Sequence, residues 1–326
     1  VSFKNLKIDE QCHITMPWHI ERDSLREKFR KSKVGTTGKG IGPTYADRTE
    51  RAGILICDLI SKDFAQILKQ ELDFQNKYFK LSTKYKEVLF MYKKYAKMVS
   101  PYVAQTTPIV REAISANKNI LFEGAQGYFL DIDAGTYPFV TSSHPGVVGI
   151  ASCFDIHPSK ITTAVGITKA YTTRVGEGPM PTKIIGREAR EIIEKGHEFG
   201  TTTGRVRSPG WLDLVLIKEA VDVNNLNCLA VTKLDVLTGF ASLKVCVGYK
   251  VGDKKVGYLG HDAKHLAVCK PVYKVLPGWH EDITNVRSFK NLPQNAKNYI
   301  RQIEDFCKVK VRFISVGPKR GEVIYV

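Results

Sequence analysis

Residues able to do chemistry gather in a few short stretches of this sequence. The first spans residues 34–43, Val-Gly-Thr-Thr-Gly-Lys-Gly-Ile-Gly-Pro. It is not a Walker A loop, because the spacing is too short and no Ser or Thr follows Lys39. Its glycines permit close backbone approach, and Thr36 and Thr37 offer hydroxyls, so it could hold a phosphate through N–H and O–H donors. An ordinary glycine-rich turn is the alternative.

A second stretch, residues 199–210, places three threonines and two arginines between glycines. It is rich in hydrogen-bond donors and nearly free of acceptors. The forked guanidinium groups of Arg205 and Arg207 match a carboxylate or a phosphate bidentately. We therefore expect a flexible loop that orders on an anionic substrate. A solvated basic loop is the alternative.

Two further stretches follow apolar runs. In Val231-Thr-Lys-Leu-Asp235, a carboxylate after a strand can accept hydrogen bonds from guanine N1–H and the 2-amino group together. Adenine offers no such donor pair, so Asp235 would select GTP over ATP, and the stem of Lys233 can cover the base plane. Backbone amides in residues 315–318 could bond guanine O6. A plain turn at a strand end is the alternative for both stretches.

The elements that must position these loops alternate along the chain. Helical periodicity covers residues 62–99, 187–195 with a stop at Gly196, about 213–223 and about 295–307. Short apolar runs predict buried strands at 120–122, 228–231 and 311–314. This alternation predicts an α/β fold with a mostly parallel sheet, whose ligands bind at the carboxyl ends of the strands. No internal repeat or linker is evident, so we predict one domain over residues 1–326.

Composition excludes several function classes. The chain has 49 Lys and Arg against 33 Asp and Glu, a formal charge of +16, which could attract nucleic acid or small polyanions. No zinc finger, RNP motif or dense basic tail appears, so anionic small molecules are the better interpretation. No apolar run is long enough to span a membrane. Seven scattered cysteines without a C-x-x-C pair predict reduced thiols in a cytosolic protein, and no zinc site is expected.

Taken together, these stretches resemble adenylosuccinate synthetase. The resemblance implies a single large domain around a mostly parallel β-sheet flanked by helices, similar to the P-loop NTPases. The matching segments occur in family order at residues 35–43, 122–127, 131–138, 141–143, 169–176, 178–179, 202–205, 210–213, 232–235, 276–279 and 315–318.

The resemblance also implies roles for individual residues. Thr37 and Thr141 would bind the phosphate of IMP, Gln126 would hold its base near the 6-oxygen, and Val175 would contact the ribose. Arg51 would reach the IMP phosphate of the neighbouring subunit in a homodimer. The full IMP set is Thr37, Arg51, Gln126, Thr141, Val175 and Arg205.

The other two substrates have their own sets. The mobile loop that closes on L-aspartate would consist of Thr201, Thr202, Thr203, Gly204, Arg205, Val206 and Arg207. The residues that would bind GTP are Arg207, Lys233, Leu234, Asp235, Ser315, Val316 and Gly317.

The family reaction implied by the resemblance has two steps. GTP phosphorylates the 6-oxygen of IMP, and the aspartate amine then displaces that phosphate from C6. The products are adenylosuccinate, GDP and phosphate, and this is the first committed step from IMP to AMP. One Mg²⁺ per subunit would neutralise the phosphates. The implied protein is a cytoplasmic homodimer that binds neither nucleic acid nor membrane.

The sequence departs from the family pattern most at its start. The family's catalytic Asp and His lie in an N-terminal phosphate loop and a following Gly-His-Thr, and neither is found from Val1 onward. We expect the catalytic residues in a segment preceding Val1, and the ligands of Mg²⁺ mainly from that segment and from GTP, with none in this chain. Residues 1–6 have the pattern of the inside of a strand and do not begin with Met, which favours the interpretation that the chain is truncated. These 326 residues alone should then make no adenylosuccinate. A non-catalytic paralogue that keeps nucleotide binding and dimer contacts is the alternative.

Overall fold

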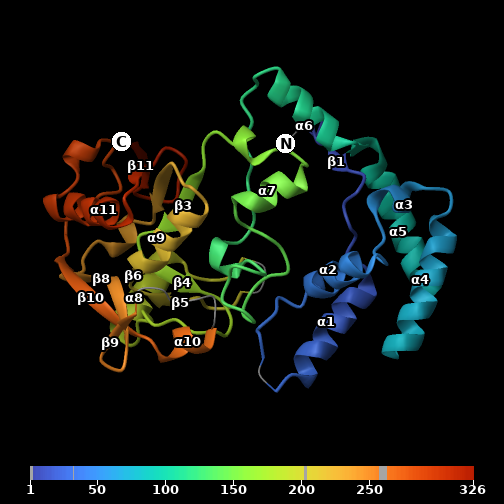
Figure 1. The fold of residues 1–326 in the computed structure, drawn as a ribbon, viewed down its shortest axis with the longest axis horizontal. Coiled ribbons are helices and arrows are strands. Elements are labelled where there is room, and N and C mark those ends of the chain that lie inside the picture. Colours follow the sequence, from blue (N-terminus) through green and yellow to red (C-terminus); the bar gives the residue numbers. More distant parts are fainter. Residues whose placement is uncertain (1–2, 32, 202–203, 257–262) are drawn as a thin grey trace. The chain divides into compact units, whose positions relative to one another are not determined.

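The structure of the chain, a computed structural model, describes residues 3–31, 33–201, 204–256 and 263–326. Contacts within the chain divide it into two compact units. Unit 1 comprises residues 1–126 and 141–160, and unit 2 comprises residues 127–140 and 161–326. Figure 1 colours both units along the sequence. One domain over the whole chain stays a prediction.

Unit 1 is mainly helical (Figure 1). Two short strands, β1 (Ile8–Asp9) and β2 (Val103–Ala104), pair in parallel. The helices are α1 (Pro17–Phe29), α2 (Ile41–Glu50), α3 (Ile56–Ile60), α4 (Phe64–Phe79), α5 (Tyr85–Val99), α6 (Thr106–Ser115) and α7 (Val147–Cys153), with 3-10 turns η1 (Ser100–Tyr102) and η3 (Pro158–Lys160).

The core of unit 1 explains the first helical prediction. Helix α4 buries Phe64, Leu68 and Leu72, which are spaced by four residues and so share one face. Helix α5 buries Val88 and Tyr92 with the same spacing. These side chains pack into one apolar cluster, so the periodic stretch forms two helices held by burial of their apolar faces.

Unit 2 contains a four-stranded sheet in the order β12-β11-β7-β3. Strands β3, β7 and β11 are neighbours and run parallel, whereas β12 pairs with β11 in the antiparallel direction. Within the described residues β3 is the final strand of this order, and its Ile167 is 78% exposed. The strands are β3 (Val165–Lys169), β7 (Cys228–Thr232), β11 (Lys310–Ser315) and β12 (Val323–Tyr325).

A second sheet of unit 2 runs in the order β10-β8-β6, with β9 paired to β8. Its strands are β6 (Leu212–Asp213), β8 (Ser242–Val251), β9 (Lys254–Val256) and β10 (Lys270–Pro277). A separate antiparallel pair is formed by β4 (Thr172–Arg174) and β5 (Ser208–Gly210). The helices are α8 (Arg187–Gly196), α9 (Leu214–Val223), α10 (Ala263–Val268) and α11 (Gln294–Cys307), with 3-10 turns η2 (Tyr128–Leu130), η4 (Asp235–Leu237) and η5 (Phe289–Asn291).

Helix α11 shows how unit 2 holds its sheet. It buries Ala296, Tyr299, Ile300 and Ile303, the spacing of one helical face. The Tyr299 hydroxyl donates to the carbonyl of Ala170, 2.6 Å away and just beyond β3. The predicted α/β class, with a mostly parallel sheet and flanking helices, is confirmed.

Two strand predictions were wrong. Residues 120–122 form no strand, and Leu121 is 90% exposed. An apolar run becomes a strand only when a neighbour takes its N–H and C=O groups, and within the described ranges no strand pairs with this run. Residues 3–6 form a turn closed by the N–H of Leu6 on the carbonyl of Phe3, whereas residues 1–2 lie outside the described residues.

Two further observations concern the cysteines and the helices. All seven cysteines are free thiols. Within the part of the chain that the structure describes, no helix combines the length and apolar character needed to cross a membrane.

Candidate active site

The carboxyl ends of three parallel strands meet at one edge of the sheet in unit 2. Strand β3 ends at Lys169, which is paired in register with Thr232 at the end of β7. On the other side of β7, Val231 pairs with Ile314, one residue before the end of β11. The loops that follow β7 and β11 therefore start side by side, at the edge where parallel sheets bind ligands.

These two loops are joined by a backbone hydrogen bond. The N–H of Leu234 donates to the carbonyl of Ser315 at 3.2 Å. Lys233 adopts a left-handed conformation, with φ of 60°, and Asp235 begins the turn η4. Burial raises the pKa of the half-buried Asp235 carboxyl. The structure thus brings together Lys233, Asp235 and Ser315, which the sequence assigned to one guanine site.

Two members of that predicted site are buried. The side chains of Leu234 and Val316 are fully buried. The N–H of Val316 donates to the carbonyl of Glu322 at 2.9 Å, so it is not a ready donor for guanine O6. Gly317 lies against the same residue, because an added Cβ would sit 2.4 Å from a carboxylate oxygen of Glu322.

A buried carboxylate that sequence reasoning missed lies beside these loops. Glu198 is fully buried, just after α8. Its oxygens accept from Lys169 Nζ at 2.8 Å, from the Tyr171 hydroxyl at 2.5 Å, from Arg207 at 3.0 Å and from Lys233 Nζ at 3.1 Å. Arg207 was assigned to aspartate and GTP and Lys233 to GTP, so Glu198 links two predicted ligand contacts.

The electrostatics of this cluster favour an anion. Burial alone would raise the pKa of Glu198, but hydrogen bonds from Lys169, Tyr171 and Arg207 outweigh it and lower the pKa to about 2. Burial also lowers the pKa of Lys169 and raises that of Tyr171. Three cations surround one carboxylate, so the cluster keeps a positive charge that attracts anionic groups.

The predicted aspartate loop is anchored to the backbone of Glu198. The N–H of Arg207 donates to the main-chain carbonyl of Glu198 at 2.8 Å, and the N–H of Gly200 to the carbonyl of Arg205 at the same distance. Thr201, Gly204, Arg205 and Val206 are exposed, whereas Thr202 and Thr203 lie outside the described residues.

Val175 lies close to this loop. Arg174, the last residue of β4, pairs in register with Ser208, which follows Arg207. Val175 is 40% exposed. The pairing therefore places the predicted ribose contact beside the end of the predicted aspartate loop.

In unit 1, three of the predicted IMP-binding segments approach one another. An added Cβ on Gly42 would lie 3.6 Å from the hydroxyl of Ser142, next to Thr141. One on Gly124 would lie 3.4 Å from the carbonyl of Pro145. The segments carrying Thr37, Gln126 and Thr141 are thus neighbours. Thr37 and Gln126 are exposed, as a ligand contact must be.

The loop around Thr37 uses its backbone donors differently from our expectation. The N–H groups of Gly35 and Gly40 donate to carboxylates of α1, and that of Gly38 donates to the Thr36 hydroxyl at 3.2 Å. These three groups are not ready donors for a phosphate. Thr37 and the remaining N–H groups are left for that role.

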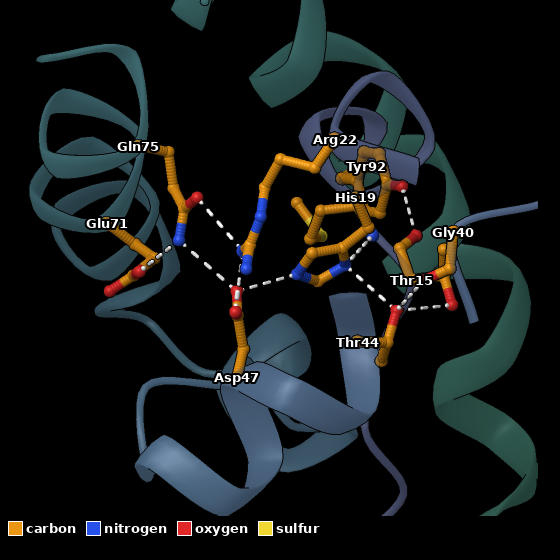
Figure 2. Close-up of polar contacts among 10 residues, drawn as sticks. Thr15, His19, Arg22, Gly40, Thr44, Asp47, Glu71, Gln75 and Tyr92 are labelled. Carbon is orange, nitrogen blue, oxygen red and sulfur yellow. Dashed lines mark hydrogen bonds and ion pairs between the residues drawn. The ribbon is translucent and has the colours of Figure 1, made fainter. Parts of the chain in front are cut away.

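Arg51 stands at the other end of the helix that follows this loop. It caps α2 in a left-handed conformation, with φ of 67°, and its side chain is exposed. Its N–H donates to the carbonyl of Arg48 at 3.1 Å. Figure 2 shows the polar contacts that hold α2 against α1 and α4.

Comparison with known proteins connects both units to one family. A family model described as adenylosuccinate synthetase matches residues 1–324. The adenylosuccinate synthetase of Clostridium perfringens is 47% identical over 332 residues, covering 100% of this chain and 78% of the relative. That of Clostridioides difficile is 50% identical over 336 residues, covering 99% and 77%.

Solved structures agree. The chain matches the fully ligated adenylosuccinate synthetase of Plasmodium falciparum with a TM-score of 0.96 at 33% identity, over 99% of this chain and 78% of that one. A cyanophage succinoaminodeoxyadenylate synthetase shares the fold at a TM-score of 0.58 and 14% identity. From the family model, the two bacterial relatives and the Plasmodium structure together, the chain belongs to the adenylosuccinate synthetase family.

Proposed function

We propose that the full-length protein containing this chain ligates L-aspartate to IMP at the expense of GTP, giving adenylosuccinate, GDP and phosphate. Membership of a family of ligases supports the reaction class. The observation that carries the proposal is the edge of the sheet in unit 2, where Lys233, Asp235 and Ser315 meet and Glu198 holds Arg207 beside Lys233.

In the proposed guanine site, Asp235 accepts hydrogen bonds from N1–H and the 2-amino group of the base. Lys233 covers the base plane with its stem while its ammonium stays on Glu198. Ser315 and Gly317 flank the base through their backbone, and the buried Leu234 and Val316 fix the two loops.

In the proposed reaction, the γ-phosphoryl group of GTP passes to the 6-oxygen of IMP. The aspartate amine then attacks C6, and the 6-oxygen leaves as part of phosphate. Arg205, Arg207 and the threonines at 201–203 hold the aspartate carboxylates. Thr37 and Thr141 bind the IMP phosphate, Gln126 its base and Val175 its ribose. Positioning and charge stabilisation account for the rate in such transfers.

The proposal includes one metal ion and a second subunit. Mg²⁺ would neutralise the transferred phosphates while bound to GTP. In a homodimer, Arg51 would contact the IMP phosphate of the neighbouring site, adding a bidentate cation to neutral donors. A cytoplasmic location agrees with seven free thiols.

A label in the 6-oxygen of IMP tests the reaction sharply. Full-length protein with IMP, GTP, aspartate and Mg²⁺ should form adenylosuccinate, GDP and phosphate in equal amounts, and the heavy oxygen should appear in the phosphate. Label released into water would contradict the phosphorylated intermediate. Tight binding of IMP and GTP without turnover would favour the non-catalytic alternative.

A further inference from the structure

One face of α1 carries a row of polar side chains turned toward the loop around Thr37. His19, Asp23 and Glu27 are spaced by four residues, so they lie one above another. The N–H of Gly35 donates to Glu27 Oε1 at 2.7 Å, and that of Gly40 to Asp23 Oδ2 at 3.1 Å. The two ends of the loop are therefore tied to α1 by carboxylates.

The loop also touches the backbone of α1 directly. Gly40 has φ of 76°, and an added Cβ would lie 2.8 Å from the carbonyl carbon of His19 and from the nitrogen of Ile20. Any side chain here would push the loop off the helix. Gly40 precedes α2, whose Thr44 hydroxyl donates back to the Gly40 carbonyl at 2.8 Å.

His19 connects the two helices with a defined tautomer. The N–H of Met16 donates to His19 Nδ1 at 2.9 Å, so that nitrogen carries no proton. The Nε2–H of His19 must then donate to Asp47 Oδ2, also at 2.9 Å. Figure 2 shows the imidazole between Asp47 on one side and Thr44 on the other. His19 and Asp47 are each 1% exposed.

Asp47 is the centre of this network. Arg22 donates to its Oδ1 at 2.6 Å, and the amide of the buried Gln75 on α4 donates to Oδ2 at 3.2 Å. Burial acts to raise the pKa of Asp47, but the hydrogen bonds from His19 and Arg22 outweigh it and lower the pKa. The carboxylate is thus charged and joins α1, α2 and α4.

Helix α2 has a proposed IMP contact near each end. The loop with Thr37 precedes it, and Arg51 follows it directly. The carbonyl of Asp47 also accepts from the N–H of Ala52 at 2.9 Å, which closes the turn containing Arg51. With ten residues, α2 is about 15 Å long. Asp47 therefore fixes the helix that lies between the two contacts.

We propose that Asp47 and His19 are positioning residues for the IMP phosphate, which set Thr37 in their own subunit and Arg51 for the partner subunit through the single rigid element α2. The inference rests on the proposed function, because it takes the IMP roles of Thr37 and Arg51 from there. Neither positioning residue touches substrate. We expect their effect to fall on IMP, because the contacts that the network makes within the described part of unit 1 join α1, α2, α4 and the loop before α2.

Asp47→Asn is the direct test in the full-length protein. Whichever way the amide turns, its NH₂ faces either the Nε2–H of His19 or the guanidinium of Arg22, so one donor meets another donor. We expect the IMP dissociation constant and KM to rise at least about tenfold, a change of about 1.4 kcal/mol. The KM for GTP should stay within about twofold of wild type.

Two further variants keep the test decisive. Thr44→Val removes one hydroxyl, which donates to the Gly40 carbonyl and also contacts His19 Nδ1 and the Thr15 hydroxyl, both at 3.0 Å. It leaves the charged contacts of Asp47 in place, so it should fold even if Asp47→Asn does not, and it should raise the IMP KM by about threefold. Tyr85→Phe is the matched control, because it removes a hydroxyl bonded to the carbonyl of Ala65 in the same unit. It should lower the melting temperature without changing the IMP KM.

The outcomes separate this inference from the proposed function. Thr37→Val and Arg51→Leu test the IMP site itself. If they weaken IMP while folded Asp47→Asn and Thr44→Val bind IMP as wild type does, positioning through α2 is refuted and the IMP site stands. Equal rises in the KM of IMP, GTP and aspartate would also refute it. If Thr37→Val and Arg51→Leu leave IMP binding unchanged, the IMP site itself is wrong.

Discussion

Replacing Glu198 by Gln removes the charge that holds three cations of unit 2 together. Lys169, Arg207 and Lys233 would each lose an ionic partner while remaining only 24%, 26% and 31% exposed. Gln keeps the size of the side chain, so the change isolates charge. We expect lower stability and a higher KM for GTP, because Arg207 and Lys233 lose their anchor.

Two arguments give the magnitude. Breaking a buried ion pair costs about 3–5 kcal/mol, and partial exposure of the cations favours the lower end. Independently, the pKa of Glu198 falls from its ordinary value of 4.5 to about 2 on folding. At about 1.4 kcal/mol per pH unit, this corresponds to about 3 kcal/mol at neutral pH. The melting temperature of unit 2 should then fall by about 6–12 °C.

The dependence on pH is the sharper signature. A carboxylate whose pKa is lowered on folding stabilises the fold fully above pH 4.5, and this stabilisation is lost as the pH falls toward 2. Denaturant titrations of wild type and Glu198→Gln should therefore differ most at pH 7. Compared with its value at pH 7, the difference in unfolding free energy between the two proteins should be smaller by about 1 kcal/mol at pH 4 and by about 2 kcal/mol at pH 3.

Glu191→Gln provides the control. Glu191 pairs with Lys195 at 2.7 Å on the surface of α8, so its loss should cost at most about 0.5 kcal/mol. If wild type and Glu198→Gln differ in unfolding free energy by the same amount at pH 7 and at pH 3, the charge of Glu198 is refuted as the source of stability. A loss of unfolding free energy in Glu198→Gln no larger than that in Glu191→Gln would also refute it.

Three further predictions follow from the same contacts. Asp235→Asn should raise the KM for GTP by about one to two decades and narrow the preference over ATP, since a hydrogen bond to a charged group is worth about 1.5–3 kcal/mol; unchanged discrimination would contradict the guanine site. Subunits defective only at Arg51 and only at Thr141 should recover activity in verified heterodimers, because one site then receives both wild-type residues; no recovery would contradict a shared site. Burial raises the pKa of Asp213 to about 6, so wild type should lose stability relative to Asp213→Asn, by up to about 3 kcal/mol, as the pH rises from about 4 to 7. Melting curves across that range check this, and parallel curves for the two proteins would contradict it.

Local sequence patterns predicted most of the helices and strands, because the spacing of apolar residues shows which face of an element is buried. The apolar runs at 228–231 and 311–314 became β7 and β11, and Gly196 ends α8 where it was expected to. The run at 120–122 is also apolar, yet it forms no strand. A strand depends on a partner supplied by another part of the chain, and composition alone does not reveal that partner.

Sequence patterns likewise revealed only some residues of the candidate site. Residues with distinctive neighbours, such as Asp235 after Thr-Lys-Leu, could be picked out by their spacing. Glu198 could not, because its partners Lys169, Tyr171 and Lys233 lie 29, 27 and 35 residues away. Nothing adjacent to Glu198 marks it as the centre of a cationic cluster. The fold alone brings these side chains together.

Strand β3 has a consequence for how the chain behaves in concentrated solution. As the final strand in its order within the described residues, with Ile167 exposed, it can accept a further strand, either from another segment of the protein or from another molecule. The charge of +16 opposes such contact, since like-charged copies repel one another. At physiological salt the Debye length shrinks to about 8 Å and much of this repulsion is lost. Colloidal stability of the protein should therefore be greatest at low ionic strength.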